Sequence, residues 1–353
     1  MNNLSKFVFK ESYRRLLMEL LCEGGAAKHM AHPFDFVKNG KELIKVFTDS
    51  IDSLERGTGS VKIDGINASI RLVNNQFVLD RGSAKPLDVK GIRPEDLESR
   101  FGTGHGMIGI GNTVIKIFDE SISTTSVELK NLGLFNNPNI MFNIEYVEGQ
   151  SNILSYDIKN FLAIHGLLEI FTATTDKDGN TKSRGTKEIQ YDKGVMESYI
   201  KKVNIVAEKY GFKILGSVKP TFRNKPNIKK PLSEMVTINF SDGPKTYTLL
   251  NWLKSVIKPT EMPTREECLK VFSSNNVETD FDKSKLNDKI NGAILWQATI
   301  KMGDEILKNL TSEIGSLDKH EGVVIRDSKI YSNPFKITGS FIIKGMSSQF
   351  KKG

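Results

Sequence analysis

Residues 60–82 have the sequence SVKIDGINASIRLVNNQFVLDRG, and this stretch decides which fold we expect. Apolar and polar residues alternate through 67–73 and again through 76–81, and a period of two predicts β-strands. The dipeptide Asn74-Asn75 between the two segments tolerates the positive φ angles that a tight hairpin turn needs. The stretch therefore predicts an antiparallel β-hairpin.

Outward from this hairpin, helical and strand patterns alternate along the chain. Apolar residues at helical spacing predict helices at 10–21, 41–54, 113–120, 127–132, 197–210 and 286–311. Short apolar runs predict further strands at 59–64, 139–145, 161–171, 321–327 and 339–344. The glycine-rich segment 102–111 lacks the Gly-Lys-Ser/Thr ending of a P-loop, so we expect a mobile loop there.

These elements predict an α+β protein with antiparallel sheets. Composition shifts along the chain divide it into three parts, which are an N-terminal helical segment at 1–57, a core at 58–214 and 313–353, and a basic insertion at 215–312. In the insertion, prolines punctuate a lysine-rich stretch before a helical pattern returns.

The formal charge of +8 is unevenly distributed. Nine basic residues but only two acidic ones lie between Lys213 and Lys258, so this segment alone has a net charge of +7. A local basic surface fits a polyanionic partner such as nucleic acid, because binding phosphates releases counterions. The alternative is a solvated, lysine-rich loop region, which charge alone does not exclude.

Several classes of protein are disfavoured. No apolar run approaches the roughly 20 residues that span a bilayer, and residues 1–11 lack the apolar core of a signal peptide. We therefore expect no membrane partner and a cytoplasmic protein, in the host-cell cytoplasm if it is viral. Cys22 and Cys268 cannot form a disulfide framework, and the five histidines show no zinc-ligand spacing.

Lys62 begins the segment KIDGIN (62–67), which suits a covalent lysine nucleophile. An amine attacks phosphorus only when it is unprotonated, and below about 0.1% of an unperturbed lysine is neutral at pH 7. Partial burial and neighbouring cations raise this fraction. Gly65 allows the backbone to approach a nucleotide closely. Taken alone, the segment fits an ordinary surface turn equally well.

Other short motifs follow in order, namely DRGS (80–83), FNIEY (142–146), the strand pattern from Phe161, EGVVIR (321–326) and FIIK (341–344). Together with KIDGIN, their order and spacing resemble the covalent nucleotidyltransferase superfamily, which comprises ATP-dependent DNA ligases, RNA ligases and mRNA capping enzymes. The resemblance covers about 59–171 and 319–350. It implies a nucleotidyltransferase core, an adenylylation domain in which antiparallel sheets surround a nucleotide cleft.

The resemblance also implies a role for each matching residue of the first motifs. Lys62 is implied as the nucleophile that carries AMP, and Asp64 and Gly65 complete its motif. Asn67 resembles the Lys-x-x-Gly-x-Asn form of the phage and editing-type branch of RNA ligases. Arg81 matches the arginine that contacts phosphate or ribose.

The later motifs match residues implied in nucleotide and metal binding. Glu145 matches the glutamate that binds ribose or a metal, and Phe161 the aromatic that stacks on adenine. Glu321 and Arg326 match the fourth motif, in which Glu321 is a second metal ligand for Mg²⁺ or Mn²⁺.

The fifth motif departs from the family pattern of two lysines. Lys344 matches one of them, but Ile342 and Met346 beside it are not basic, so we expect Lys336 to provide the second. No segment remains for the C-terminal OB domain of DNA ligases and capping enzymes. The insertion at 215–312 is the expected nucleic-acid clamp instead.

The function expected from this resemblance is ATP-dependent sealing of 5′-phosphate and 3′-hydroxyl ends or nicks by an RNA ligase. A DNA ligase with an unusual clamp is the first alternative, and a capping-type guanylyltransferase fits less well without an OB domain. A third alternative is a nucleic-acid-binding protein that has kept the fold and lost catalysis. ATP is favoured over NAD because no nicotinamide-binding module is evident. The sequence does not identify a protein partner.

Overall fold

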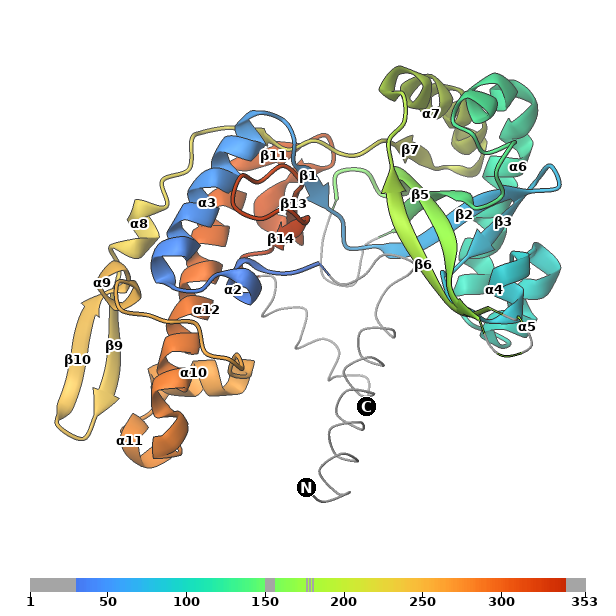
Figure 1. Cartoon of the computed structure of the whole chain (residues 1–353). Helices are drawn as coiled ribbons and strands as arrows, with labels where there is room; N and C mark the ends of the chain where they lie inside the picture. The colour runs from blue at the N-terminus through green and yellow to red at the C-terminus, as the bar shows by residue number, and fades with distance from the viewer. Residues whose placement is uncertain (1–29, 150–155, 176, 178, 180, 341–353) are drawn as a thin grey trace. The chain divides into compact units, whose positions relative to one another are not determined.

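The computed structural model describes residues 30–149, 156–175, 177, 179 and 181–340 (Figure 1). The described chain divides into two compact units. The sheet unit comprises the described parts of 65–151 and 158–217, and the helical unit comprises the described parts of 30–64, 152–157 and 218–353. The predicted boundary at 214 lies near the division at 217/218, whereas those at 57 and 312 fall inside the helical unit.

The sheet unit contains most of the long strands. Its strands are β2 (Ile66–Val73), β3 (Gln76–Asp80), β4 (Ile140–Val147), β5 (Phe161–Thr175), β6 (Thr181–Ile189) and β7 (Lys213–Leu215). Its helices are α4 (Pro86–Lys90), η1 (Pro94–Asp96), α5 (Leu97–Phe101), α6 (Met107–Asn131), α7 (Lys193–Ala207) and η2 (Glu208–Tyr210).

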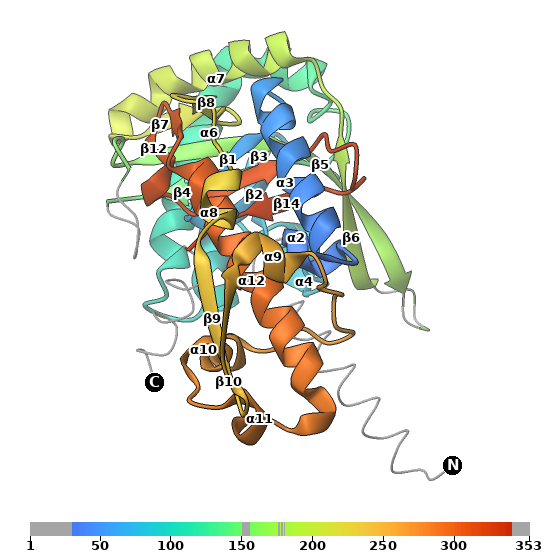
Figure 2. The ribbon, with the colours of Figure 1, turned by 90° about the vertical axis from the view of Figure 1, so that its left-hand side faces the viewer.

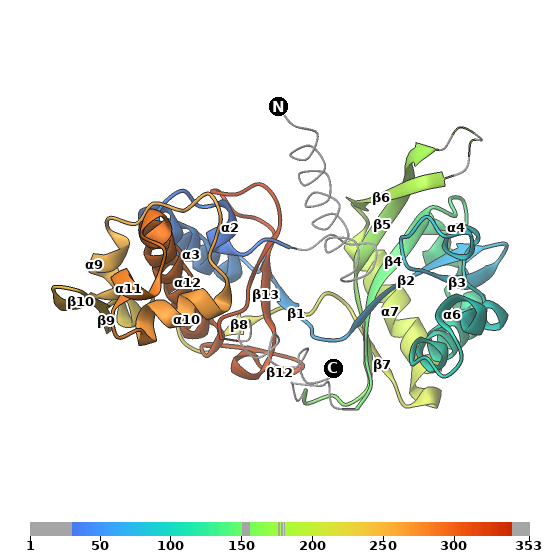
Figure 3. The same cartoon turned by 90° about the horizontal axis from the view of Figure 1, so that it is seen from below.

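These strands form one sheet in the order β3-β2-β4-β5-β6, with every neighbouring pair antiparallel, and β7 pairs in parallel with the start of β5. The β2–β3 turn has positive φ angles of 51° at Asn74 and 60° at Asn75, which confirms the predicted hairpin. β5 and β6 continue beyond the neighbouring strands as a long hairpin (Figure 3).

One face of this sheet is apolar and is covered by α6 and α7 (Figure 1). Buried side chains from alternate strand positions pack with both helices, and Phe142 of β4 stacks on Tyr199 of α7 at 4.9 Å between ring centroids. Successive side chains of a strand point to opposite faces. The intervening positions of the strands therefore form a second face, here called the polar face, with Asn67, Arg71, Asp80, Asn143, Glu145 and His165.

The helical unit combines helices with short strands. Its helices are α2 (Pro33–Phe36), α3 (Gly40–Glu55), α8 (Lys229–Leu232), α9 (Leu249–Leu253), α10 (Arg265–Ser273), α11 (Val277–Asp280), η3 (Lys283–Lys285), α12 (Leu286–Leu307) and η4 (Leu317–Lys319). Its strands are β1 (Ser60–Lys62), β8 (Thr221–Phe222), β9 (Met235–Phe240), β10 (Gly243–Thr248), β11 (Leu310–Ser312), β12 (Gly315–Ser316), β13 (Gly322–Ile325) and β14 (Phe335–Ile337).

The largely buried helix α12 is the centre of this unit, and α2, α3, α8, α9 and α10 pack against it (Figure 2). Strands β1, β13 and β14 form a three-stranded antiparallel sheet in the order β1-β13-β14. This sheet brings Lys62 of β1 opposite Gly322 of β13, although 260 positions of sequence number separate them. None of the helices in the described parts of the chain combines the length and apolar content needed to cross a bilayer.

The mixed α and β class with antiparallel sheets is confirmed, as are the predicted helices at 41–54 and 286–311 and the strands at 139–145 and 161–171, within a few residues at their ends. The predicted loop at 102–111 is wrong in its second half, where α6 begins at Met107. Close packing explains why a glycine stands at position 111 inside this helix. A Cβ there would lie 2.5 Å from Leu97 Cδ2 and 2.8 Å from Leu79 Cδ1.

The structure differs from the predictions at several further elements. The helices predicted at 113–120 and 127–132 are parts of the single helix α6. Strands β6 and β7 were not predicted, since β6 is rich in lysine and threonine and β7 has only three residues. The last described strand is Phe335–Ile337, and residues 339 and 340 of the strand predicted at 339–344 lie in a turn. The predicted helix at 10–21 and residues 341–344 lie outside the described residues.

Candidate active site

Lys62 stands at the end of β1 with its ammonium group against a carboxylate. Lys62 Nζ lies 2.8 Å from Glu321 Oε2 and 3.1 Å from the Ile63 carbonyl oxygen. The pairing of Lys62 with Gly322 causes this contact, because Glu321 directly precedes Gly322. Both side chains keep some exposure, 27% for Lys62 and 12% for Glu321. The two motifs that the sequence linked by resemblance therefore meet within the helical unit.

Lys336 lies in the same three-stranded sheet. It pairs with Val324 in β13, which pairs with Ser60 in β1. Directly paired residues share a face of a sheet, and so do residues two apart along a strand. Lys336 is therefore on the same face of this sheet as Lys62. Arg326 follows the end of β13 in this unit, and Lys344 lies outside the described residues.

Asp64 is held through its backbone. Its N–H donates to Tyr156 Oη at 2.7 Å, and the Tyr156 ring lies 4.8 Å from that of His320. His320 is only 3% exposed. Neither of its ring nitrogens has a well-formed hydrogen bond to another described residue. Burial lowers the pKa of His320 from 6.5 to about 4, against the opposing effects of Asp157, Asp318 and the Ile314 backbone.

This buried histidine predicts an acid-sensitive step in stability. The unfolded chain binds the His320 proton near the ordinary pKa of 6.5, whereas the folded chain binds it only near 4. The free energy of unfolding should therefore fall by up to about 3 kcal/mol as the pH drops from 6.5 to 4. Urea titrations across this range should show a smaller drop for His320→Gln than for the wild type. His105→Gln, which changes an exposed histidine, is the matched control and should keep the full drop.

Gly65 and Glu145 are joined in the sheet unit. The Gly65 N–H donates to Glu145 Oε1 at 3.1 Å, and a Cβ at residue 65 would lie only 2.7 Å from the Tyr146 carbonyl oxygen. Glycine is therefore required by close packing at this position. The other oxygen, Glu145 Oε2, lies 3.2 Å from His165 Nε2. The carboxylate is thus oriented from two sides.

Asn67 lies beside Glu145 on the polar face. Its side-chain NH₂ donates to Asn143 Oδ1 at 2.9 Å and more weakly to the Ile144 carbonyl oxygen at 3.4 Å. Its Oδ1 atom is buried and has no hydrogen-bond partner among the described residues. A buried acceptor left unpaired costs about 1–3 kcal/mol. A ligand hydroxyl or amino group that donates to Asn67 would recover this cost.

Arg81 is carried on the turn that follows β3. Its guanidinium donates to the Asn67 carbonyl oxygen, and its backbone N–H donates to Asp88 Oδ1 at 3.1 Å. Burial lowers the pKa of Arg81, Asp88 opposes this, and the neighbouring Arg100 lowers the pKa further. Glu145 also raises the pKa of Arg81, so Arg81 lies among charged groups of both signs.

Phe161 begins β5 and is fully buried. Its neighbour Leu162 belongs to the apolar core beneath α6 and α7, so alternation places Phe161 on the polar face with Glu145 and Asn67. Its stacking on adenine stays a prediction.

Sequence reasoning missed several residues that surround the predicted ones, which are Tyr156 and His320 in the helical unit and Asp88, His165 and Arg184 in the sheet unit. The one signal that could have found His165 is a lone histidine in the otherwise apolar run FLAIHGLL. The others became visible only through contacts between distant segments.

The predicted metal ligands Glu145 and Glu321 belong to different units. In the part of the chain that the structure describes, no three His, Cys, Asp or Glu side chains cluster as a metal site. Mg²⁺ is usually held by one or two carboxylates and completes its shell with water and substrate phosphates. A single carboxylate, Glu145 or Glu321, is compatible with this chemistry.

The basic segment is partly neutralised. Lys213 belongs to the sheet unit, and the other eight cations belong to the helical unit. In the helical unit, Lys225 pairs with Glu55 at 2.9 Å and Lys245 with Asp242 at 3.0 Å.

Comparison with protein-family models, curated proteins and solved structures found no significant match to this chain.

Proposed function

We propose that this chain is an ATP-dependent polynucleotide ligase of the covalent nucleotidyltransferase type, an RNA ligase in preference to a DNA ligase. The observation that carries the proposal is the 2.8 Å contact of Lys62 Nζ with Glu321 Oε2. It brings together two motifs, 259 residues apart, that the resemblance independently assigns to one reaction centre. Glu145, Asn67 and Arg81 on and beside the polar face support the nucleotide-binding part of the proposal.

In the proposed first step, Lys62 Nζ forms a bond to the α-phosphorus of ATP. The bond to the bridging oxygen breaks, and pyrophosphate leaves with the electron pair. Attack requires the neutral amine, and Glu321 Oε2 is close enough to take the lysine proton. Mg²⁺ bound with ATP would neutralise charge on the phosphate oxygens, held by Glu145 or Glu321.

Two further phosphoryl transfers complete the proposed reaction. An oxygen of a 5′-phosphate end attacks the lysyl-AMP phosphorus, the N–P bond breaks, and Lys62 regains its proton. A 3′-hydroxyl then attacks the activated 5′-phosphate, a phosphodiester forms and AMP leaves. Such transfers depend mainly on positioning and on cations around the developing charge, which Arg326 and Lys336 would supply.

Covalent labelling tests the proposal directly. The purified chain is incubated with Mg²⁺ and α-³²P-labelled ATP, GTP or adenylate-labelled NAD, then denatured and resolved on a gel. We expect label from ATP alone. Label from GTP would indicate a capping-type guanylyltransferase. Label from NAD would mean that the cofactor is NAD and not ATP. The absence of label from all three would make the catalytically degenerate nucleic-acid-binding protein the leading function.

A substrate comparison separates RNA from DNA ligation. A nicked DNA duplex, a nicked RNA duplex and a single-stranded RNA with a 5′-phosphate are offered side by side at equal concentration. We expect sealing of RNA at a rate at least about tenfold above DNA. Faster sealing of nicked DNA would support the alternative of a DNA ligase.

The lysines of the basic segment should contribute to polynucleotide binding. Lys229 and Lys230 of α8 and the nearby Lys225 have exposed side chains. Changing all three to glutamine should weaken binding and reduce the slope of log affinity against log salt by about 2–3, because each phosphate contact contributes about 0.7–0.9. Filter binding at several salt concentrations measures the slope. The matched control changes the exposed Lys193, Lys201 and Lys209, and equal slopes for both variants would assign the segment another role.

A further inference from the structure

The turn at 80–83 carries Arg81 and is fixed by two carboxylates. Asp80 Oδ1 accepts from the Gly82 N–H at 2.7 Å, and Gly82 takes a φ of +70°, which glycine adopts without strain. Asp88 accepts from the Arg81 N–H and from the Ser83 hydroxyl. Both carboxylates are fully buried. The direction in which Arg81 leaves the backbone is therefore set by these two groups.

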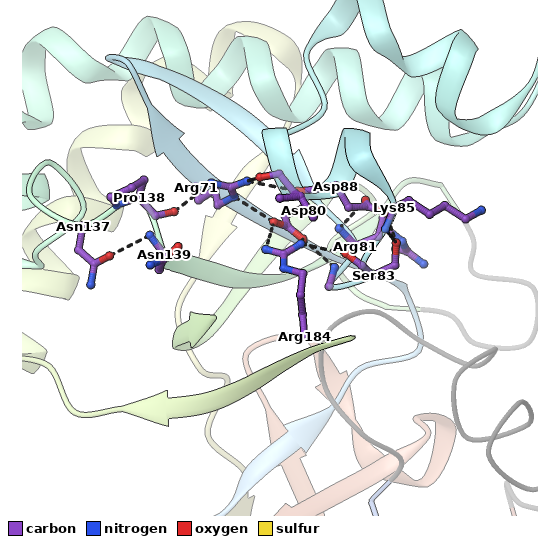
Figure 4. Close-up of polar contacts among 12 residues, drawn as sticks. Arg71, Asp80, Arg81, Ser83, Lys85, Asp88, Asn137, Pro138, Asn139 and Arg184 are labelled. Atoms are coloured by element: carbon purple, nitrogen blue, oxygen red, sulfur yellow. Dashed lines mark hydrogen bonds and ion pairs between the residues drawn. The ribbon is translucent and has the colours of Figure 1, made fainter. Parts of the chain in front are cut away.

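Arg184, on β6, holds the same turn from the far edge of the sheet (Figure 4). Its Nη2 lies 2.8 Å from Asp80 Oδ2 and its Nη1 lies 3.0 Å from Asp80 Oδ1, which is the bidentate arrangement that arginine favours. Nη1 also donates to the Ser83 carbonyl oxygen at 3.1 Å. Because β3 and β6 are the two edge strands in the order β3-β2-β4-β5-β6, this contact is made across the polar face and not between neighbouring strands.

Arg184 can be removed without leaving a buried carboxylate unpaired. Asp80 Oδ2 also accepts from Arg71 Nε at 2.9 Å, and Arg71 is itself held by the carbonyl oxygens of Pro138, Asp88 and Val89. With Arg184 replaced, Asp80 therefore keeps one guanidinium partner. The replacement removes the hydrogen bonds that join β6 to the Ser83 carbonyl oxygen and to the Asp80 carboxylate.

We propose that Arg184 is a positioning residue for Arg81. It acts through Asp80 and Ser83 to hold the Arg81 turn in the conformation that presents the guanidinium to a phosphate or ribose of the bound nucleotide. The inference rests on the proposed function for the identity of the ligand. Its structural part, the fixing of the turn by Arg184, is independent of that function.

The experiment compares Arg184→Met and Arg184→Lys with the wild-type full-length chain. Lys187→Met is the matched control, since Lys187 also lies on β6 and forms an exposed ion pair with Glu169 at 2.8 Å. Two experiments are carried out. The first follows the rate constant of self-labelling against ATP concentration, and its half-saturating concentration and maximal value are here called KM and kcat. The second measures the amide hydrogen exchange of Arg81 and Gly82.

In Arg184→Met we expect exchange of both amides to accelerate at least about tenfold. The KM for ATP should rise about tenfold, with kcat changed less than about threefold. Arg184→Lys should give exchange rates and a KM between those of the wild type and Arg184→Met. An ammonium group can pair with Asp80 but cannot form the several hydrogen bonds that the guanidinium makes to Asp80 and Ser83. Lys187→Met should leave both measurements unchanged.

Unaccelerated exchange in Arg184→Met would overturn the inference, whatever the chain does with ATP. Accelerated exchange with an unchanged KM would also overturn it, since the turn would then be held for stability alone. If the wild type takes no label from ATP, the proposed function fails by itself. The exchange measurement then still decides whether Arg184 fixes the turn, and KM is replaced by the Kd for ATP from equilibrium dialysis.

Discussion

Replacing Lys62 by arginine is expected to abolish covalent labelling of the chain by ATP, by at least about 10⁴-fold, while the fold remains intact. Arginine keeps the positive charge, so the contact with Glu321 survives in the variant. It has no neutral form near pH 7, however, and is therefore not a nucleophile. Label on the denatured chain measures the loss, and circular dichroism with a thermal unfolding curve verifies the fold.

Lys336→Arg is the matched control for this experiment. Lys336 shares a face of the three-stranded sheet with Lys62, and the proposal uses it only as a cation. Arginine supplies that charge, so this variant should still label. Persistent labelling of Lys62→Arg would place the nucleophile elsewhere in the chain. Loss of label in both variants together with a lowered unfolding temperature would indicate damage to the β1-β13-β14 sheet.

The elements that the sequence predicts best are those whose signal is local. The hairpin turn at Asn74 and Asn75 and the helix Gly40–Glu55 depend on neighbouring residues, and the structure has both as expected. The strand Thr181–Ile189 has no such signal, because its sequence TKSRGTKEI is polar and is held by pairing with β5. Gly111 likewise suggested a loop, although its role is close packing inside α6.

In the candidate site, too, some residues could be predicted from the sequence, whereas those held only by contacts between distant segments could not. The resemblance selected Lys62 and Glu321, and the pairing of β1 with β13 brings them into contact. The resemblance also selected Gly65 and Glu145, which are hydrogen-bonded to each other in the sheet unit. The residues that orient them were not predictable. His165, the partner of Glu145, is the extra residue of β5 at a register shift opposite Asn143 and Ile144 of β4. A bulge of this kind has no reliable signature in a single sequence.

The second large effect concerns stability and is expected for Asp80→Asn. Asp80 is fully buried and is the shared carboxylate of Arg71 and Arg184, whose side chains are each only 6% exposed. Removing the charge leaves two buried guanidinium groups without their counterion. Breaking a buried ion pair in this way costs about 3–5 kcal/mol. Urea unfolding should show a loss of this size for Asp80→Asn.

Glu169→Gln is the matched control for the Asp80 experiment. Glu169 on β5 pairs with Lys187 on β6, the strand that also carries Arg184, but this pair is in an exposed position. An exposed pair contributes only about 0–1 kcal/mol, so this variant should be nearly as stable as the wild type. Similar losses for the two variants would mean that burial does not set the energetics of the Asp80 cluster.

The double variant Asp80→Asn/Arg184→Met separates the cost of an orphaned charge from the value of the pair. In the wild type, Arg184→Met removes a bidentate bond and should destabilise the protein. In the Asp80→Asn background, the same change removes one of two buried cations that have lost their counterion. Arg184→Met should therefore cost less there, or stabilise, and a double-mutant cycle should give a coupling of about 1–3 kcal/mol. Additive losses would mean that Arg184 and Asp80 act independently, against the bidentate contact on which the positioning of Arg81 depends.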